Sequence, residues 1–183
     1  MKPSMQLLCG VLAVTLWSAA CADDFTRERG EGEKYEERNK AKDALEGKPP
    51  PALAVTGWEN TDGNELTLAG LKGKVVVLDF WGVWCGPCRA AMPHLKELYA
   101  RHKDEGLVVI GVHTKTKAEE MSAYVKEVEL PWAVAVDAEG ETVKSFAVDS
   151  YPDYYVIDRQ GNLRVADLAN KELDRVVEAL LKE

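Results

Sequence analysis

The chain has 183 residues, of which 46% are hydrophobic and 30% are charged, and its formal net charge is −8. This composition is normal for a soluble globular protein and excludes a protein with several membrane spans. The negative charge argues against nucleic acid as the main partner, because a phosphate backbone requires a basic face. The length predicts one domain of ordinary size with some appended sequence.

Residues 1–22 have the pattern of a secretory signal peptide. Lys2 precedes a short apolar run at residues 7–16, and small residues follow at 18–22. A membrane span needs roughly 20 apolar residues, and this run is shorter, although an uncleaved N-terminal anchor is the alternative interpretation. We therefore expect the protein to be exported.

Two processing geometries compete at the end of this segment. Ala20-x-Ala22 fits an ordinary signal peptidase, whereas residues 18–21 resemble a bacterial lipobox, in which Cys21 would carry lipid. Ser18 stands where a lipobox usually has Leu. We expect Cys21 to be lipidated. The protein is then expected to be periplasmic or lipid-anchored to a bacterial membrane facing the periplasm. Its contact with that membrane would be through the lipid alone.

Residues 23–50 predict a charged, flexible tether. Phe25, Tyr35 and Leu45 are its large apolar residues up to position 48, too few to offset the entropy of ordering the segment. Residues 34–45 have at most transient helical character in this interpretation. Three prolines at 49–51 stiffen the chain before the domain, which we place at residues 51–183.

The domain has the hydrophobic pattern of an α/β fold. A turn signal at 62–64 between short apolar runs predicts a hairpin, and the continuous apolar runs at 75–80 and 107–112 predict strands buried on both faces. Helices are expected after residue 85, after Thr116 with Glu119 as a capping box, and from Asn170. Further strands are expected at 132–136, 154–157 and 163–165. The alternation predicts a mixed sheet covered by helices on both sides.

Cys85 and Cys88 form the most informative pattern. The leader accounts for Cys9 and Cys21, so this C-x-x-C pair contains the remaining two of four cysteines and is expected to react rather than to serve as a scaffold. A strand ends just before the pair and a helix begins at about Cys85, where unpaired N–H groups and the helix dipole stabilise a thiolate. Cys88 lies one turn later, positioned to attack a mixed disulfide of Cys85.

A zinc site is the alternative use of a C-x-x-C pair. Such a site needs four ligands, and the three histidines of the chain are not paired with one another at ligand spacing, so we predict no metal. One of them, His113, ends a strand expected to run parallel to that at 75–80. It should therefore lie at the same edge of the sheet as the cysteines.

Residues 84–88, Trp-Cys-Gly-Pro-Cys, match the thioredoxin active-site motif, and the domain from about residue 51 onward resembles the TlpA/ResA branch of exported thioredoxin-like proteins. The resemblance implies a thioredoxin fold with a mixed central sheet flanked by helices. It also implies an N-terminal hairpin extension that ends at 71–74 and a helix–strand insertion between 112 and 137. Cys85 would be the attacking thiol and Cys88 the resolving thiol, with no cofactor.

The same resemblance assigns further residues. Pro152 matches the cis-proline that lies against the dithiol and offers its preceding backbone to substrate; an ordinary trans turn proline is the alternative. Asp79 matches the buried aspartate that exchanges protons with the resolving thiol, and burial should raise its pKa; a purely structural aspartate is the alternative. The expected substrate-binding residues are Trp84, Gly86, Pro87, Tyr151 and Pro152, although Tyr151 departs from the small or β-branched residue common before that proline.

The resemblance implies a protein disulfide reductase that acts on protein disulfides outside the cytoplasm with electrons from a membrane thiol donor. Reduction is favoured because Gly86-Pro87 between the cysteines matches thioredoxin, a reductant. A thiol peroxidase is one alternative, but the Thr that this family has three residues before its Cys is Gly82 here. A non-enzymatic metal-binding chaperone is another.

Overall fold

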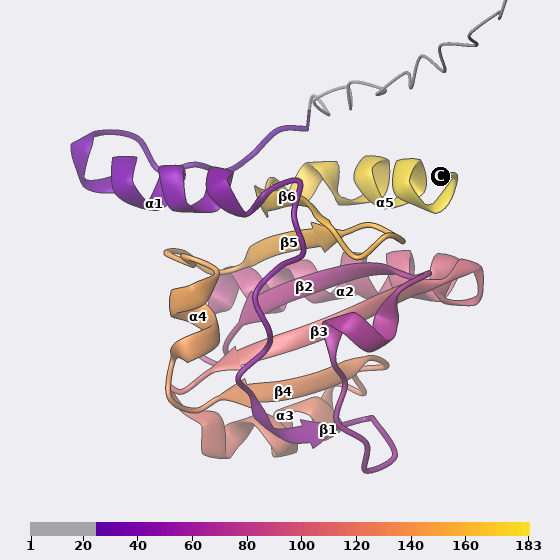
Figure 1. Cartoon of the computed structure of the whole chain (residues 1–183). Coiled ribbons are helices and arrows are strands. Elements are labelled where there is room, and N and C mark those ends of the chain that lie inside the picture. The colour runs from indigo at the N-terminus through magenta and orange to yellow at the C-terminus, as the bar shows by residue number, and fades with distance from the viewer. Residues whose placement is uncertain (1–24) are drawn as a thin grey trace, which may run out of the picture.

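The computed structural model describes residues 25–183, and six strands among these residues form one mixed sheet (Figure 1). The strands are β1 Thr56–Glu59, β2 Val75–Trp81, β3 Leu107–Thr114, β4 Ala133–Asp137, β5 Asp153–Ile157 and β6 Leu163–Leu168. Their order across the sheet is β1-β4-β3-β2-β5-β6. β2, β3 and β4 are parallel, whereas β1 is antiparallel to β4, β5 to β2 and β6 to β5. The predicted mixed sheet is confirmed.

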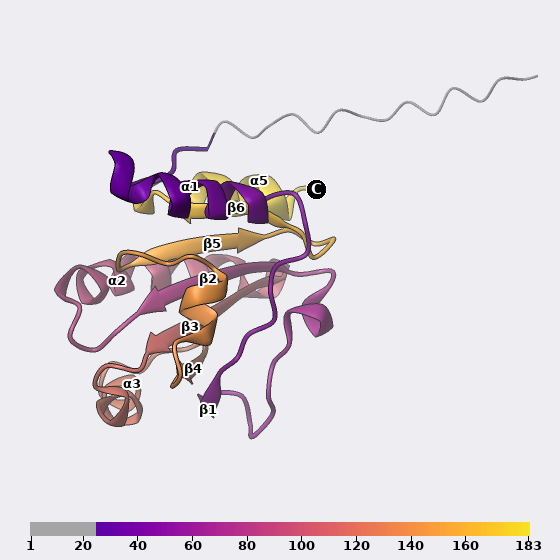
Figure 2. The same cartoon turned by 60° about the vertical axis from the view of Figure 1, so that its left-hand side comes forward.

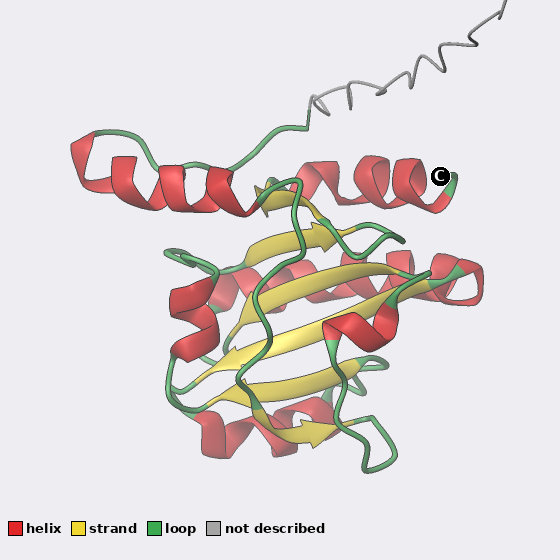
Figure 3. Ribbon diagram, viewed as in Figure 1, coloured by secondary structure: helices red, strands yellow, loops and turns green. Residues whose placement is uncertain are grey.

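Helices lie on both faces of this sheet, as Figure 3 shows by colour. The α-helices are α1 Glu33–Leu45, α2 Gly86–His102, α3 Met121–Glu127, α4 Glu141–Ser145 and α5 Leu173–Leu181. In Figure 1, α2 and α3 lie behind the sheet and α4 lies in front of it. The predicted helix and strand between 112 and 137 are confirmed as α3 and β4.

The central strand β2 is buried along its whole length. Because side chains alternate along a strand, its residues divide between two apolar clusters, one on each face of the sheet. The cluster on the α2 face contains Val75, Val77 and Trp81 together with Cys85 and Cys88. The cluster on the α4 face contains Val76, Leu78 and Phe80. Asp79 therefore points toward the α2 face, where the cysteines lie.

The segment predicted as a flexible tether is instead folded from residue 25 onward. Phe25 is buried, and the backbone of residues 26–28 hydrogen-bonds to residues 167–169 at the end of β6. The helix α1 lies beside β6 in both views (Figures 1 and 2). Ion pairs and backbone hydrogen bonds to distant residues hold this segment in place, so it folds although it contains few apolar residues. The folded domain thus includes residue 25, whereas the sequence predicted that it starts at residue 51.

The predicted hairpin before β2 is also wrong. β1 pairs with β4 at the edge of the sheet, and Leu68–Leu71 forms a short 3-10 helix. The apolar residues of this segment, including Val55 and Leu66, pack against the α4-face cluster instead of pairing with each other. The capping box predicted at Thr116 does not form either, because a 3-10 turn at Ala118–Glu120 precedes α3, and Glu120, which caps that helix, makes no side-chain cap hydrogen bond.

Candidate active site

Cys85 and Cys88 form a disulfide bond at the start of α2. Cys85 is the N-cap residue of this 17-residue helix, and its Sγ accepts a hydrogen bond from the backbone N–H of Cys88 at 3.1 Å. Pro87 lies in the first turn, where the missing N–H of a proline costs no intrahelical bond. The first turn directs N–H groups and the positive end of the helix dipole at Cys85 Sγ, which stabilises a thiolate there once the disulfide is reduced.

Asp79 is buried on the same face of the sheet as the dithiol. Asp79 is 3% exposed, and its Oδ1 has no hydrogen-bond partner among residues 25–183. Burial raises the pKa of Asp79 from 3.8 to about 7. A carboxyl with this pKa exists in both protonation states at neutral pH, so it can accept or donate a proton.

The peptide bond between Tyr151 and Pro152 is cis, as predicted. The next residue, Asp153, pairs with Phe80 near the end of β2, so Pro152 lies at the edge of the sheet from which the chain enters the dithiol turn. The ring of Tyr151 meets the ring of Trp84 edge-on, with centroids 5.6 Å apart. Trp84 is 43% exposed, whereas Trp81 is fully buried, so Trp84 presents an aromatic surface beside Cys85.

His113 supports the turn that leads into Cys85. Its Nε2 accepts a hydrogen bond from the backbone N–H of Val83 at 3.0 Å, and its Nδ1 lies 2.6 Å from the carbonyl oxygen of Thr114, to which it donates. Burial lowers the pKa of His113, which keeps Nε2 available as an acceptor. The sequence placed His113 at this edge of the sheet but did not indicate this contact.

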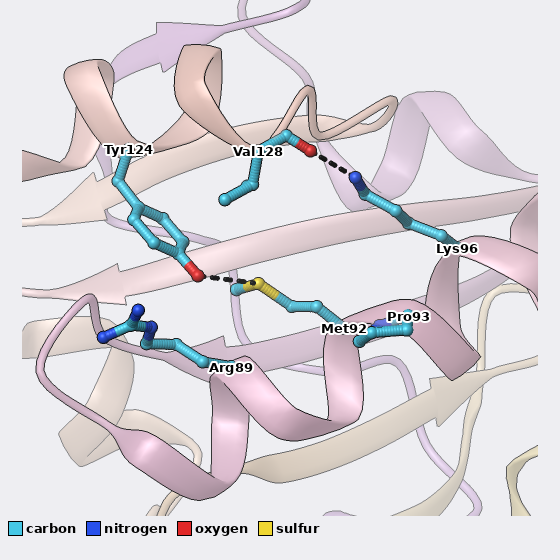
Figure 4. A pocket seen from close by; sticks show the side chains of 6 residues that line it. All are labelled: Arg89, Met92, Pro93, Lys96, Tyr124 and Val128. Carbon is cyan, nitrogen blue, oxygen red and sulfur yellow. Dashed lines mark hydrogen bonds between the residues drawn. The ribbon is translucent and has the colours of Figure 1, made fainter.

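A groove lies between α2 and the segment of α3 and its C-terminal end, as Figure 4 shows. One cavity of about 260 Å³ is lined by Arg89, Met92, Pro93, Lys96, Tyr124 and Val128. The hydroxyl of Tyr124 donates to Met92 Sδ at 3.7 Å, and Lys96 binds the carbonyl oxygen of Val128. A second cavity of about 500 Å³ shares Arg89 and Tyr124 with the first and extends to Val83, two residues before Cys85. Sequence reasoning missed this groove, because its walls come from two separate helices.

A smaller cavity of about 140 Å³ is lined by Trp84, Tyr151 and Asp137 among other residues. The carboxyl of Asp137 is fully buried and accepts a hydrogen bond from the backbone N–H of Val143 at 2.7 Å. Cavities thus adjoin the dithiol turn at Val83 and at Trp84. Gly86 at the start of α2 has open space beside its Cα.

Residues 25–183 contain neither a metal-binding cluster nor a helix that could span a membrane. No three His, Cys, Asp or Glu side chains in this range are grouped so that they could hold a metal ion. No helix in the same range is long and apolar enough to cross a membrane. The predicted leader and Cys21 lie outside the described residues.

Comparison with known proteins identifies the family. The sequence model of the AhpC/TSA family matches residues 46–166, which is about two thirds of the chain. The chain belongs to the AhpC/TSA family. One relative, the thiol-disulfide oxidoreductase ResA of Bacillus thuringiensis subsp. konkukian, is 32% identical over 177 residues, which cover 97% of this chain and 90% of that protein.

Solved structures share the fold. A crystal structure from Chlorobium tepidum, described as a DsbE thiol:disulfide interchange protein, has a TM-score of 0.66 at 28% identity and covers 74% of this chain and 97% of its own. The thioredoxin domain of a thiol-disulfide oxidoreductase from Bacteroides vulgatus has a TM-score of 0.65 at 26% identity with the same coverage. This AhpC/TSA-family chain is a thiol–disulfide oxidoreductase with a thioredoxin-like fold.

Proposed function

We propose that this protein reduces disulfide bonds of protein substrates outside the cytoplasm, with Cys85 as attacking thiol and Cys88 as resolving thiol. The observation that carries the proposal is the Cys85–Cys88 disulfide at the N-terminus of α2, which is the oxidised end state of such a cycle. The relatives described as thiol-disulfide oxidoreductases support it.

The reaction transfers two electrons from the reduced dithiol to the substrate. The Cys85 thiolate attacks one sulfur of the substrate disulfide, a mixed disulfide forms, and the other substrate sulfur leaves as a thiolate that takes a proton. Cys88 then loses its proton to the Asp79 carboxylate and attacks Cys85 Sγ. The bond between Cys85 and the substrate breaks, the second substrate thiolate leaves, and the proton held by Asp79 is available to it.

Substrate binding falls to the residues around the dithiol. Trp84 offers an aromatic surface and the half-buried cis-proline loop offers its backbone, and an extended chain bound there would place its disulfide over Cys85 Sγ. Gly86 and Pro87 add no long side chain beside Cys85.

Location and electron supply complete the proposal. Residues 1–22 would direct export, and lipid on Cys21 would attach the protein to a membrane, where a thiol carrier could re-reduce Cys85 and Cys88. Because Phe25 is buried in the domain, no more than four residue steps separate Cys21 from the fold. Four residues span at most about 14 Å, so an anchored domain would stay close to the bilayer surface.

The deciding experiment is the reduction potential of the Cys85–Cys88 pair, measured by equilibration with glutathione together with the rate of insulin reduction. We expect a potential near the thioredoxin value of about −270 mV and measurable insulin reduction. A potential near about −120 mV would identify an oxidant instead. Rapid peroxide consumption without insulin reduction would identify the peroxidase that we considered as the alternative.

A further inference from the structure

A buried ion cluster joins the N-terminal helix to the loop that carries the cis-proline. The Nζ of Lys42, on α1, lies 2.6 Å from Asp149 Oδ1, 2.7 Å from Asp167 Oδ2 and 3.4 Å from Asp153 Oδ2. The Lys42 side chain is fully buried, and the three carboxylates are 0–4% exposed. An ammonium group has three N–H donors, and here three carboxyl groups surround it.

The cluster keeps its cation charged. Burial by itself would lower the pKa of Lys42, but the negative charge of Asp153 and the hydrogen bonds that Lys42 donates to Asp149 and Asp167 outweigh it and raise that pKa above its usual value. Removing one member of such a buried set leaves the others without compensation, which is strongly destabilising locally. Lys42 therefore constrains the position of the backbone segments that contain Asp149, Asp153 and Asp167.

Two of the three carboxylates flank the cis-proline. Asp149 lies two residues before Tyr151, and Asp153 directly follows Pro152. Asp153 also pairs with Phe80 in the sheet, which fixes the far end of the loop. Asp149 belongs to no helix or strand, so its contact with Lys42 is the ion pair that holds the near end.

The third carboxylate has a second cation nearby. Asp167 lies on β6, with its Oδ2 4.0 Å from Arg29 Nη1 as well as 2.7 Å from Lys42 Nζ. Loss of the Lys42 charge would therefore leave Asp167 partly compensated. The effect would be greatest at Asp149, whose ion pair is with Lys42, because burial and the charge of Asp167 raise the pKa of Asp153 and favour its neutral form.

We propose that Lys42 is a positioning residue for substrate binding: by holding Asp149 and Asp153, it fixes the Tyr151–Pro152 backbone relative to Cys85. The inference rests on the proposed function, because it assigns Lys42 to the substrate-binding part of that site. It implies that α1 is part of the active-site architecture. A polypeptide substrate depends on the loop backbone, whereas a small disulfide needs only access to the Cys85 thiolate.

The test compares Lys42→Met with Lys40→Met. Lys40 is two residues earlier on α1, its side chain is 79% exposed, and it pairs only with Glu36 among the ion pairs of the described residues. We expect Lys42→Met to raise KM for insulin by between about 10- and 100-fold, the scale of a misplaced binding group. Its rate with oxidised glutathione and its reduction potential should stay at the wild-type values. Lys40→Met should match the wild type in all three.

Two further variants separate positioning from loosening of α1. Glu46→Gln, at the C-cap of α1, weakens the ion pairs with Arg27 and Arg29 and the hydrogen bond from the N–H of Ala166 but does not touch the loop, so KM for insulin should not rise. Asp149→Asn removes one partner of Lys42, is milder than Lys42→Met if that variant does not fold, and should raise KM in the same way. Equal slowing of insulin and glutathione, or unchanged KM in both cluster variants, would overturn the inference. Wild-type protein inactive on insulin would instead overturn the proposed function.

Discussion

The Nε2 of His113 and the backbone N–H of Val83 are joined by a buried hydrogen bond of 3.0 Å, which ties the end of β3 to the turn before Cys85. Substituting His113→Leu leaves this N–H buried without a partner, which should lower stability by about 1–3 kcal/mol. His113→Gln, whose side-chain oxygen can accept, should recover part of that loss. Urea unfolding of both variants measures it, with His94→Ala as a surface control.

The same hydrogen bond gives a pH dependence. Because burial lowers the pKa of His113 below its usual 6.5, the unfolded chain binds this proton first as the pH falls. The stability that neutral His113 contributes is thus present above about pH 6.5 and is lost as the pH falls below that value. The acid-side loss of stability should be smaller in His113→Gln than in the wild type. An identical pH profile for the two proteins would contradict this assignment.

The Cys85→Ser and Cys88→Ser variants should give different products with a disulfide substrate. Cys85→Ser removes the attacking thiol and should abolish insulin reduction. Cys88→Ser keeps the attacking thiol but cannot resolve, so it should accumulate a mixed disulfide with substrate. Non-reducing gels of each variant mixed with a disulfide-bonded substrate show the difference. Trapping by neither variant would mean that the assigned order is incorrect.

Asp79→Asn tests the proton transfer to and from Cys88. The amide keeps the shape of the carboxyl but does not titrate, so resolution of the mixed disulfide should slow by about 10- to 10⁴-fold near neutral pH. Formation of the mixed disulfide at Cys85 should change little. Stopped-flow measurement of both steps against pH separates them, and wild-type resolution in Asp79→Asn would show that Asp79 is structural.

The stability of the same variant should depend on pH in a defined direction. The pKa of Asp79 is raised from 3.8 to about 7 by burial, so the folded state holds a proton that the unfolded state has lost between these values. Wild-type stability from this group is therefore present below about pH 4 and is lost as the pH rises toward 7, by on the order of 4 kcal/mol. Asp79→Asn lacks that loss. Its advantage over the wild type in urea unfolding should be small at about pH 4 and largest above about pH 7.

Lipidation of Cys21 is tested on the mature protein. We expect mass spectrometry of the N-terminus to show a lipid-modified Cys21, and Cys21→Ser to move the protein from the membrane to the soluble fraction. Activity on insulin in solution should be the same for both forms, because Cys21 precedes the folded domain. An unmodified N-terminus at Asp23 would support the competing cleavage after Ala22.

Local pattern by itself determined much of the site. The apolar run at 75–80 followed by Cys85 and Cys88 placed a dithiol at a strand-to-helix turn, because burial on both faces and the helix start are both set by neighbouring residues. The cis bond before Pro152 and the burial of Asp79 followed from the resemblance and were confirmed in the structure. The mixed sheet followed from the alternation of elements.

Tertiary structure decided how the N-terminal segment folds. Residues 23–48 contain too few apolar side chains to predict order, yet α1 folds because Lys42 meets carboxylates 107, 111 and 125 residues away. Likewise, β1 pairs with β4 and does not form the local hairpin that the sequence predicted. Contacts between residues so far apart in the sequence depend on which segments the sheet brings together. No local periodicity of the sequence predicts that arrangement. The link between α1 and the cis-proline loop is therefore visible only in the folded molecule.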